Sequence, residues 1–187
     1  FIFFLFEIIL WRNKFSFGIN AVSFLSGSFE IVLSILCYDF FDYWWHRWNH
    51  KVNFLWRFHK IHHMDNHMDV TTALRFHPGE LITSFFYKII WIILWSPSIE
   101  GFIAAEISIS LFSQFHHANF SSPLKIEQKL SHYIITPKLH EIHHNYERKI
   151  RDHNFSTIFV IWDKIFNTYL NNPQRYDEKL GLKQIRS

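Results

Sequence analysis

The alternation of long apolar stretches with polar, histidine-rich segments constrains this fold more than any other feature of the chain. Apolar residues dominate 21–45, 79–95 and 99–115, and residues 1–11 look like the end of a further membrane helix. Because a helix rises about 1.5 Å per residue, each of the last two long stretches covers about 25 Å, near the lower limit for crossing a bilayer. We therefore predict an all-α chain that forms an integral membrane helical bundle.

A short turn, Ser96-Pro97-Ser98, separates the last two apolar stretches, so we expect a helical hairpin there. A hairpin returns the chain to the side it left, which places both histidine-rich regions, 46–77 and 116–187, on one membrane face. These regions hold five and eleven Lys and Arg residues, and the hairpin turn holds none. The positive-inside rule then predicts a cytosolic histidine-rich cap, in the bacterial inner membrane or the endoplasmic reticulum, although Arg12 and Lys14 oppose this orientation.

Charge and cysteine content exclude several classes of protein. The formal net charge is +3, but no basic run is interleaved with stacking aromatic residues, so we expect no nucleic acid partner. Cys37 is the single cysteine, which excludes disulfides, cysteine-rich zinc folds and cysteine-ligated iron–sulfur clusters. The sequence opens on Phe1, so we expect a truncated N-terminus and treat residues 1–187 as one domain.

The polar C-terminal region contains one further helical pattern. Ile126, Leu130, Tyr133 and Ile134 repeat at helical spacing. This pattern predicts an amphipathic helix that lies on the membrane surface.

Three motifs collect eight of the fourteen histidines. Because residues at i, i+3 and i+4 share a helix face, we expect each motif to present its imidazoles to one point. Imidazole suits iron and zinc, and eight such ligands exceed what one ion coordinates. The duplicated His-x-Ile-His-His pattern therefore predicts two metals in a pseudo-symmetric pair of sites. The motifs are His46-Arg-Trp-Asn-His50, His59-Lys-Ile-His62-His63 and His140-Glu-Ile-His143-His144.

Two other functions are compatible with parts of this pattern. Residues 140–144 also satisfy the His-Glu-x-x-His pattern of zinc proteases, with Glu141 as the general base. The twin motif has Lys60 at that position, however, and a protease leaves the first two motifs unexplained. A non-enzymatic metal transporter would need polar groups along a path through the membrane, where we expect only Glu30 and Glu106.

The motifs and their neighbours resemble the fatty acid hydroxylase/sterol desaturase superfamily. Residues 39–50 and 55–63 are similar to its first two histidine boxes, residues 137–144 to its last box, and residues 162–169 to its closing motif. The family also places a histidine after the hairpin, where His117 matches its His-Ala-Asn pattern and His116 is the alternate. The resemblance thus implies nine metal ligands: His46, His50, His59, His62, His63, His117, His140, His143 and His144.

This resemblance implies a membrane-bound oxidoreductase with two irons per chain. It would use O2 to attack an unactivated C–H bond of a lipid, by hydroxylation or desaturation. The sequence leaves open whether the lipid is a sterol, a fatty acid, a sphingoid base or an alkylglycerol. No flavin or nicotinamide fingerprint occurs, so the electrons must come from a separate reductase or small redox protein.

Metal-bound imidazoles usually donate their second N–H to a carboxylate or a carbonyl group. We expect a set of carboxylates and amides to provide this support: Asp39, Asp42, Glu80, Asn119, Asp152, Asn154 and Asp163. His67, His77, His132 and His153 lack motif spacing, so we expect them to be structural or on the surface. Ser156 and Asn167 stand where the family commonly has glycine, which puts the shape of that loop in question.

Overall fold

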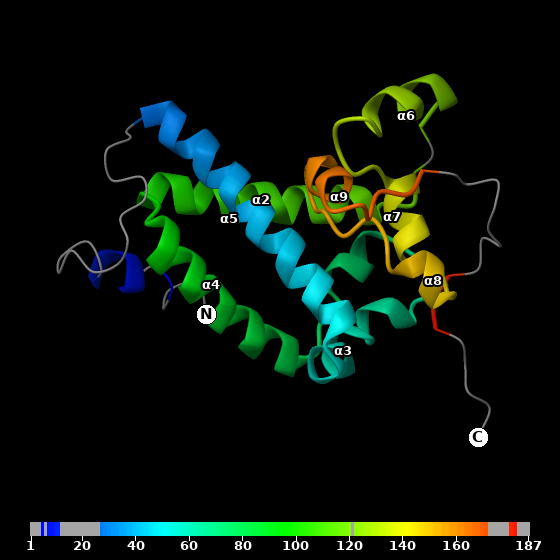
Figure 1. Ribbon diagram of the computed structural model, residues 1–187, viewed down its shortest axis with the longest axis horizontal. Helices are drawn as coiled ribbons and strands as arrows, with labels where there is room; N and C mark the ends of the chain where they lie inside the picture. The colour runs from blue at the N-terminus through cyan, green and yellow to red at the C-terminus, as the bar shows by residue number, and fades with distance from the viewer. Residues whose placement is uncertain (1–4, 6, 12–26, 121, 172–179, 183–187) are drawn as a thin grey trace.

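Three long helices form the frame of the molecule: α2 (Gly27–Lys51), α4 (Pro78–Trp95) and α5 (Ile99–His117). The computed structural model describes residues 5, 7–11, 27–120, 122–171 and 180–182. Short helices gather around one end of the three long ones (Figure 1). They are α3 (Asn53–His59), η1 (His62–Met64), η2 (Val70–Leu74), α6 (Leu124–Leu130), α7 (Pro137–His143), α8 (Arg148–Arg151) and α9 (Ile161–Ile165). The predicted all-α class is confirmed for the described residues.

The predicted hairpin is present, and each of its helices begins with a side-chain cap. The Nδ1 atom of His77 accepts a hydrogen bond from the Gly79 N–H, and Pro78 occupies the first turn of α4. Ser96 ends α4 with φ of 66°, and the Ser98 hydroxyl caps α5 by accepting from the Gly101 N–H. His77 is therefore a structural histidine, as expected.

A buried carboxylate ties the start of α2 to the start of α5. The Glu30 carboxylate accepts hydrogen bonds from the Ser34 hydroxyl and from both the backbone N–H and the hydroxyl of Ser98. A Cβ atom on Gly101 would lie 2.7 Å from Glu30 Oε1, so only glycine allows this approach. Because polar groups in an apolar bundle must be satisfied internally, this contact fixes how α2 and α5 pack.

A second polar cluster joins all three long helices near their middle. Lys88 on α4 bonds to both carboxylate oxygens of Glu106 on α5 at 2.7 Å, and the Tyr38 hydroxyl on α2 donates to Oε1 of the same group. Glu106 was predicted to lie in the membrane, whereas Lys88, in the apolar stretch 79–95, was not recognised as its partner. The charge of Glu106 is thus paired by a lysine of the neighbouring helix.

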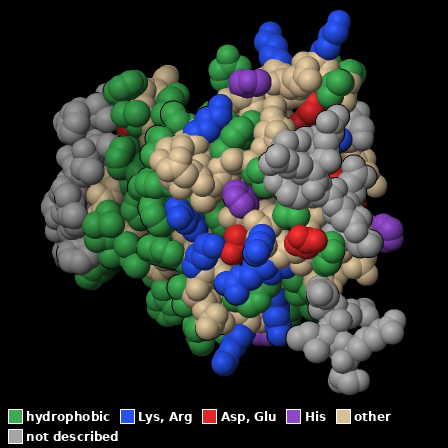
Figure 2. Space-filling model, turned by 45° about the vertical axis from the view of Figure 1, so that its right-hand side comes forward, with side chains coloured by type: hydrophobic (Ala, Val, Ile, Leu, Met, Phe, Trp, Pro, Cys, Tyr) green, Lys and Arg blue, Asp and Glu red, His purple; other side chains and the backbone are tan. Residues whose placement is uncertain are grey.

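The surfaces of the long helices are strongly apolar. On α4, Ile82, Phe86 and Ile90 are each about half exposed or more. Hydrophobic side chains dominate the left of the face in Figure 2, whereas most Lys and Arg side chains lie at its centre and right. Among the described residues, α4 is the one helix that is long and apolar enough to span a membrane by length and composition.

The packed interior of this frame lies between the long helices and the described N-terminal residues. Leu5 and Ile9 are fully buried in one cluster with Trp91, Ile92 and Phe102. The Trp91 ring also stacks on Tyr38 with a centroid distance of 4.4 Å. Residues 21–26, the beginning of the first long apolar stretch, lie outside the described residues.

The predicted amphipathic surface helix is wrong beyond Leu130. The helix α6 ends there, and the chain turns back to pair with a distant segment. Ile135 N–H donates to the Ile158 carbonyl, and the Tyr133 carbonyl accepts from Val160 N–H. These long-range hydrogen bonds override the local helical periodicity, which a pattern of apolar residues cannot reveal.

Candidate metal centre

The predicted ligands lie where the long helices meet the short ones. His46 and His50 occupy the last turns of α2, and His117 is the last residue of α5. The second motif spans the junction of α3 and η1, and the third lies on α7 and its C-terminal cap, His144. All nine histidines named from the sequence therefore come together at one end of the molecule.

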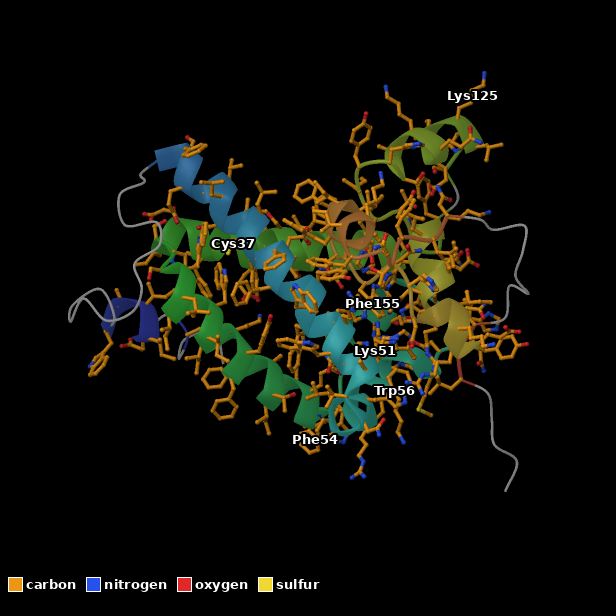
Figure 3. All side chains as sticks on the ribbon, viewed as in Figure 1. Cys37, Lys51, Phe54, Trp56, Lys125 and Phe155 are labelled. Carbon is orange, nitrogen blue, oxygen red and sulfur yellow. The ribbon has the colours of Figure 1, made fainter. Side chains whose placement is uncertain are left out.

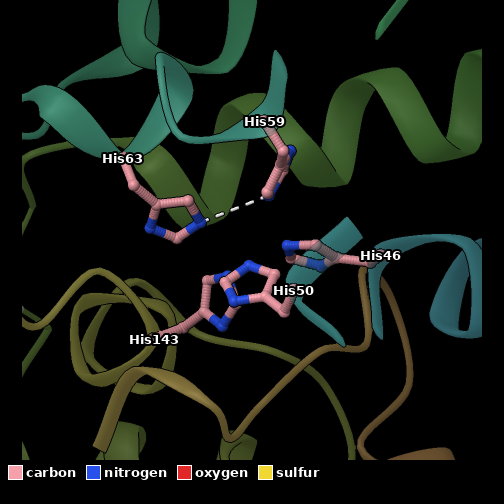
Figure 4. Close-up of side chains that lie close together, drawn as sticks. All are labelled: His46, His50, His59, His63 and His143. Carbon is pink, nitrogen blue, oxygen red and sulfur yellow. Dashed lines mark hydrogen bonds between the residues drawn. The ribbon is translucent and has the colours of Figure 1, made fainter. Parts of the chain in front are cut away.

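These nine histidines form two compact groups, in each of which the possible ligand atoms lie within 4.8 Å of one another. In the first group, drawn in Figure 4, His59 and His63 face the side chains of the other three across a small gap. Eight of the nine side chains are buried, and His46 is half-buried. The first group is His46, His50, His59, His63 and His143, and the second is His62, His117, His140 and His144.

The structure corrects the expectation that all imidazoles of one motif face the same point, because each twin motif is divided between the two groups. In each twin motif the two histidines at i and i+4 enter one group, and the third enters the other. His59 and His63 thus belong to the first group and His62 to the second, whereas His140 and His144 belong to the second and His143 to the first. The two motifs thus exchange one histidine, an arrangement consistent with the predicted pseudo-symmetric pair of sites.

Backbone carbonyl groups set the tautomers of four of these imidazoles. A carbonyl oxygen can only accept, so each Nδ1 that faces one must carry the hydrogen, and Nε2 is left with its lone pair. The four pairs are His46 with Phe155 at 2.8 Å, His62 with Thr72 at 3.0 Å, His117 with Ser113 at 2.6 Å and His143 with His153 at 2.8 Å. His59 donates in the same way to the Glu80 carboxylate at 2.7 Å.

The tautomers of His62 and His117 test whether the second group suits a metal ion. Both Nδ1 atoms donate to carbonyls, yet the two Nε2 atoms lie 3.1 Å apart. Two lone pairs at this distance repel each other unless a positive charge lies beside them. Two nitrogens that each bind one ion at ~2.1 Å and at right angles are ~3 Å apart. His140 Nε2 continues the chain of contacts, 3.1 Å from His117 and 3.2 Å from His144.

Protonation is a poor alternative source of that positive charge. Burial lowers the pKa of His62, His117 and His143, and repulsion from the positive charges of neighbouring histidines lowers it further. The pKa of His62 and of His143 lies well below its ordinary value, and that of His117 falls to about 4. Near neutral pH these imidazoles are therefore uncharged and available as ligands. The same direction holds for His46, His50, His63, His116, His140 and His144.

Several buried ring nitrogens in the groups also lack a hydrogen-bond partner among the described residues. His46 and His143 each leave Nε2 without one, and His50 leaves both nitrogens, although its Nδ1 lies 3.4 Å from Asp152. Such atoms cost free energy in a buried site unless a ligand satisfies them. The residues present therefore fit two bound metal ions.

The loop after α8 supplies part of this support through its backbone. Asp163 accepts hydrogen bonds from the N–H groups of Phe155 and Ser156, and Asp39 accepts from Ile158 and Phe159. These bonds hold the Phe155 carbonyl against His46. Figure 3 places Phe155 at the short-helix end, away from Cys37 on α2. Asp39 and Asp163 were expected to accept from the imidazoles, but they hold the loop instead. The acceptors for four of the imidazoles are backbone carbonyls, which no side-chain pattern marks.

The backbone conformation of Asn167 explains why asparagine can stand where the family commonly has glycine. Its φ is 56°, a left-handed conformation that glycine adopts most easily and asparagine tolerates. Ser156 has no such conformation, and its backbone N–H bonds to Asp163. The loop therefore keeps its shape without either glycine.

The other histidines, and the acidic and amide residues Glu141 and Asn119, lie outside the two histidine groups. His116 does not join the second group; its Nδ1 donates to the Thr157 carbonyl at 3.2 Å. His67 and His132 are exposed, and His153 contributes its carbonyl to His143. Glu141 lines a separate cavity, together with Asn119.

A cavity of about 320 Å³ opens beside both histidine groups. It lies between α2, α4 and α5, and its walls include His46, His62 and His117 at one end and Lys88 on α4. Glu80 and Lys88, eight residues apart on one face of α4, set its extent at about 12 Å along that helix. The site therefore combines two histidine groups with a cavity that runs between the apolar helices.

Comparison with known proteins gives a consistent result. The family model described as fatty acid hydroxylase matches residues 31–168, which include all nine histidines. The chain is similar to human alkylglycerol monooxygenase, with 32% identity over 135 residues that make up 70% of this chain and 28% of that protein. It is 26% identical over 158 residues to the ornithine lipid hydroxylase OlsE of Rhizobium tropici, covering 83% of this chain and 46% of OlsE.

A third relative is a cholesterol 25-hydroxylase-like protein of Caenorhabditis elegans, with 28% identity over 145 residues that cover 73% of this chain and 45% of that protein. The chain thus spans less than half the length of each of these relatives. No solved structure matches the chain significantly.

Proposed function

Because the chain belongs to the fatty acid hydroxylase family, we propose that it is a membrane-bound di-iron oxygenase that hydroxylates or desaturates a lipid. O2 is the oxidant, and a separate reductase or small redox protein supplies the electrons. The relatives are named for oxidation of alkylglycerols and ornithine lipids, which supports a lipid substrate for this chain too.

One observation supports the metal centre most strongly. His62 and His117 present their Nε2 lone pairs to each other at 3.1 Å inside a buried group of four histidines. The first group offers five more imidazoles, so we propose that one iron binds in each. Two bound irons would supply the activation of O2 and the attack on a C–H bond.

The chain's own residues supply position and exclusion of water. The carbonyls of Phe155, Thr72 and His153 hold the imidazoles in the tautomer that a metal ligand requires. The cavity lets a lipid segment approach the histidines from between the long helices. Burial of both groups keeps bulk water away from the reacting carbon.

The protease and transporter alternatives receive less support. A zinc protease needs a general base beside its metal, but Glu141 does not line the cavity at the histidines. A transporter needs a polar path, but Glu30 is occupied by Ser34 and Ser98, and Glu106 by Lys88 and Tyr38. A zinc protease also leaves the first histidine group without a role.

Growth under isotopically labelled O2 tests the proposed function. Cells with the active protein are expected to contain a lipid that carries one labelled oxygen atom or has gained a double bond. The product should disappear with His62→Ala and remain with His132→Ala, which removes an exposed histidine outside both groups. An unchanged lipid profile, or a product that survives His62→Ala, would contradict an oxygenase at this site.

Membrane orientation gives a separate prediction. We propose that the long helices span the membrane and that the histidine face is cytosolic, because sixteen Lys and Arg residues flank it. In a Cys37→Ser background, Glu100→Cys at the exposed hairpin end should react with an impermeant thiol reagent in intact cells. Lys149→Cys, exposed on α8, should react only after the cells are opened. The opposite labelling pattern would refute the orientation.

A further inference from the structure

Trp56, on α3, connects the first histidine group to the surface of the protein. Its ring centroid lies 5.1 Å from that of His50 and 5.6 Å from that of His63, two members of that group. The residue is nevertheless only partly buried, and Figure 3 labels it at the short-helix end of the molecule. The indole thus contacts buried imidazoles and also reaches solvent.

Other aromatic rings that touch the histidines do not offer this connection. Phe155 packs against His46 but is fully buried. Phe76 stacks on His62 and is exposed, but it lines the cavity between the long helices, where we propose that a lipid approaches. Trp56 does not line that cavity, so it is open to a partner from the short-helix end.

Positively charged side chains surround the indole. The guanidinium carbon of Arg151 lies 4.7 Å from the centre of the Trp56 ring, within the range of a cation–π contact. Lys60 is exposed one helical turn from Trp56, and its backbone N–H donates to the Trp56 carbonyl. Arg148 and Lys149 precede Arg151 on α8, and both are exposed.

Lys51, the last residue of α2, extends this basic surface by pairing with Asp152 at the end of α8. The Trp56 rim is the set of these five cations: Lys51, Lys60, Arg148, Lys149 and Arg151. The caps of α8 contribute the carboxylates Glu147 and Asp152, which the five cations outnumber. The rim therefore carries net positive charge and attracts an acidic protein.

A buried redox centre receives electrons only from a carrier that approaches it closely, because electron transfer slows steeply with distance. Complexes of redox proteins are small and weak, so complementary charge decides how often the carrier arrives. The indole shortens the remaining gap to the histidines. Arg151 above the ring disfavours a positive charge on the indole, so the ring acts as a bridge and is not itself oxidised.

We propose that an acidic one-electron carrier docks on the Trp56 rim and that its electrons reach the first histidine group through the indole. At each visit the carrier is oxidised by one electron, and a metal ion held by the group is reduced by one. Two visits, with two protons from solvent, turn one oxygen atom of O2 into water. The other oxygen enters the C–H bond, or in desaturation leaves as a second water with the two hydrogens of the lipid. This electron delivery rests on the proposed function, whereas docking on the rim does not.

Binding of a plant-type [2Fe–2S] ferredoxin, an acidic one-electron carrier, tests the docking surface. The purified protein is studied in detergent, both iron-loaded and metal-free, and Kd is measured by biolayer interferometry. We expect Kd to rise about tenfold between about 20 mM and about 200 mM salt, because salt screens the attraction between exposed charges. Cytochrome c, a basic carrier, should not bind.

Two double variants locate the surface. Lys60→Glu combined with Lys149→Glu reverses two exposed charges of the rim and should weaken binding at low salt about tenfold. The matched control is Lys125→Glu combined with Lys129→Glu, two exposed positions on α6. Figure 3 places Lys125 far from Trp56, so the control should keep the wild-type Kd.

Anaerobic mixing with reduced ferredoxin tests the entry route, and the absorbance of the ferredoxin itself reports its oxidation. With the oxidised, iron-loaded protein, Trp56→Leu should lower the limiting rate at saturating ferredoxin and leave Kd unchanged. Trp56→Phe keeps an aromatic ring and should retain most of that rate. Reduced methyl viologen, a small cationic reductant, should reduce every variant at the wild-type rate. Iron content is measured for each variant, so that loss of metal is not mistaken for loss of the route.

Ferredoxin that does not bind, binding that ignores salt, or equal weakening by both double variants would overturn docking on the rim. A wild-type limiting rate in Trp56→Leu, or an equal slowing with methyl viologen, would overturn the route through the indole. If Trp56→Leu does not fold, Trp56→Met, whose flexible side chain fills irregular gaps, takes its place. Docking on the rim of a protein without oxygenase activity would overturn the proposed function and leave the docking surface standing.

Discussion

Replacing His143 by alanine is expected to lower turnover at least about 100-fold, since loss of residues that merely support a metal ligand already costs 10–100-fold. His143 is the member of the third motif that crosses to the first group, where its ring lies 4.4 Å from that of His46 and 4.8 Å from that of His63. The measurement is the product formed per minute by purified protein supplied with iron, O2 and an electron donor.

Glu141→Gln is the matched control for this prediction, two residues away on α7. Its side chain lies outside both histidine groups, so we expect activity to fall only a few-fold. A zinc protease would behave in the opposite way, because removal of its general base abolishes water attack while the metal stays bound. Complete loss of activity in Glu141→Gln, with His46→Ala and His143→Ala still active, would favour the protease.

Lowering the pH is expected to destabilise the metal-free protein steeply. Unfolded histidines titrate near pH 6.5, whereas in the folded chain burial holds the pKa of His62 and His143 well below that value and that of His117 at about 4. Below about pH 6.5 the unfolded chain therefore binds more protons, so the free energy of unfolding falls as pH falls. Each such histidine contributes up to about 1.4 kcal/mol per pH unit across this window, and stability should level off above about pH 7.

Thermal unfolding of the metal-free protein between about pH 8 and pH 5 measures this effect. His143→Gln removes one of the titrating groups and should make the dependence shallower. His132→Ala, at an exposed position, should leave the dependence on pH nearly as it is in the wild-type protein. A Tm that rises as pH falls from 7 to 5 would contradict the assignment of neutral, buried imidazoles.

Much of the arrangement of the three long helices could be predicted from the lengths of the apolar stretches in the sequence. The hairpin of α4 and α5 follows from two apolar runs and the Ser96–Ser98 turn, and both helices end close to the expected positions. The region after Leu130 could not be predicted in this way, because hydrogen bonds to residues 158–160 decide its path. Lys88 was also missed, since its charge has meaning only when Glu106 lies beside it on the neighbouring helix.

The composition of the site was more accessible to prediction than its division into two groups. Motif spacing identifies the clustered histidines because i and i+4 positions share a face. Spacing cannot show that His62 and His143 cross to the opposite groups, because this depends on how the α3–η1 junction packs against α7. The carbonyls of Phe155 and Thr72 have no sequence signature, since every residue carries one.

The iron content of the active protein shows whether each histidine group binds a metal ion. After anaerobic purification we expect about two irons per chain, one for each histidine group, from the number of imidazole ligands. His50→Ala, in the first group, and His144→Ala, in the second, should each lower the content to about one. Purified protein that is fully active with a single zinc ion and no iron would contradict a di-iron centre.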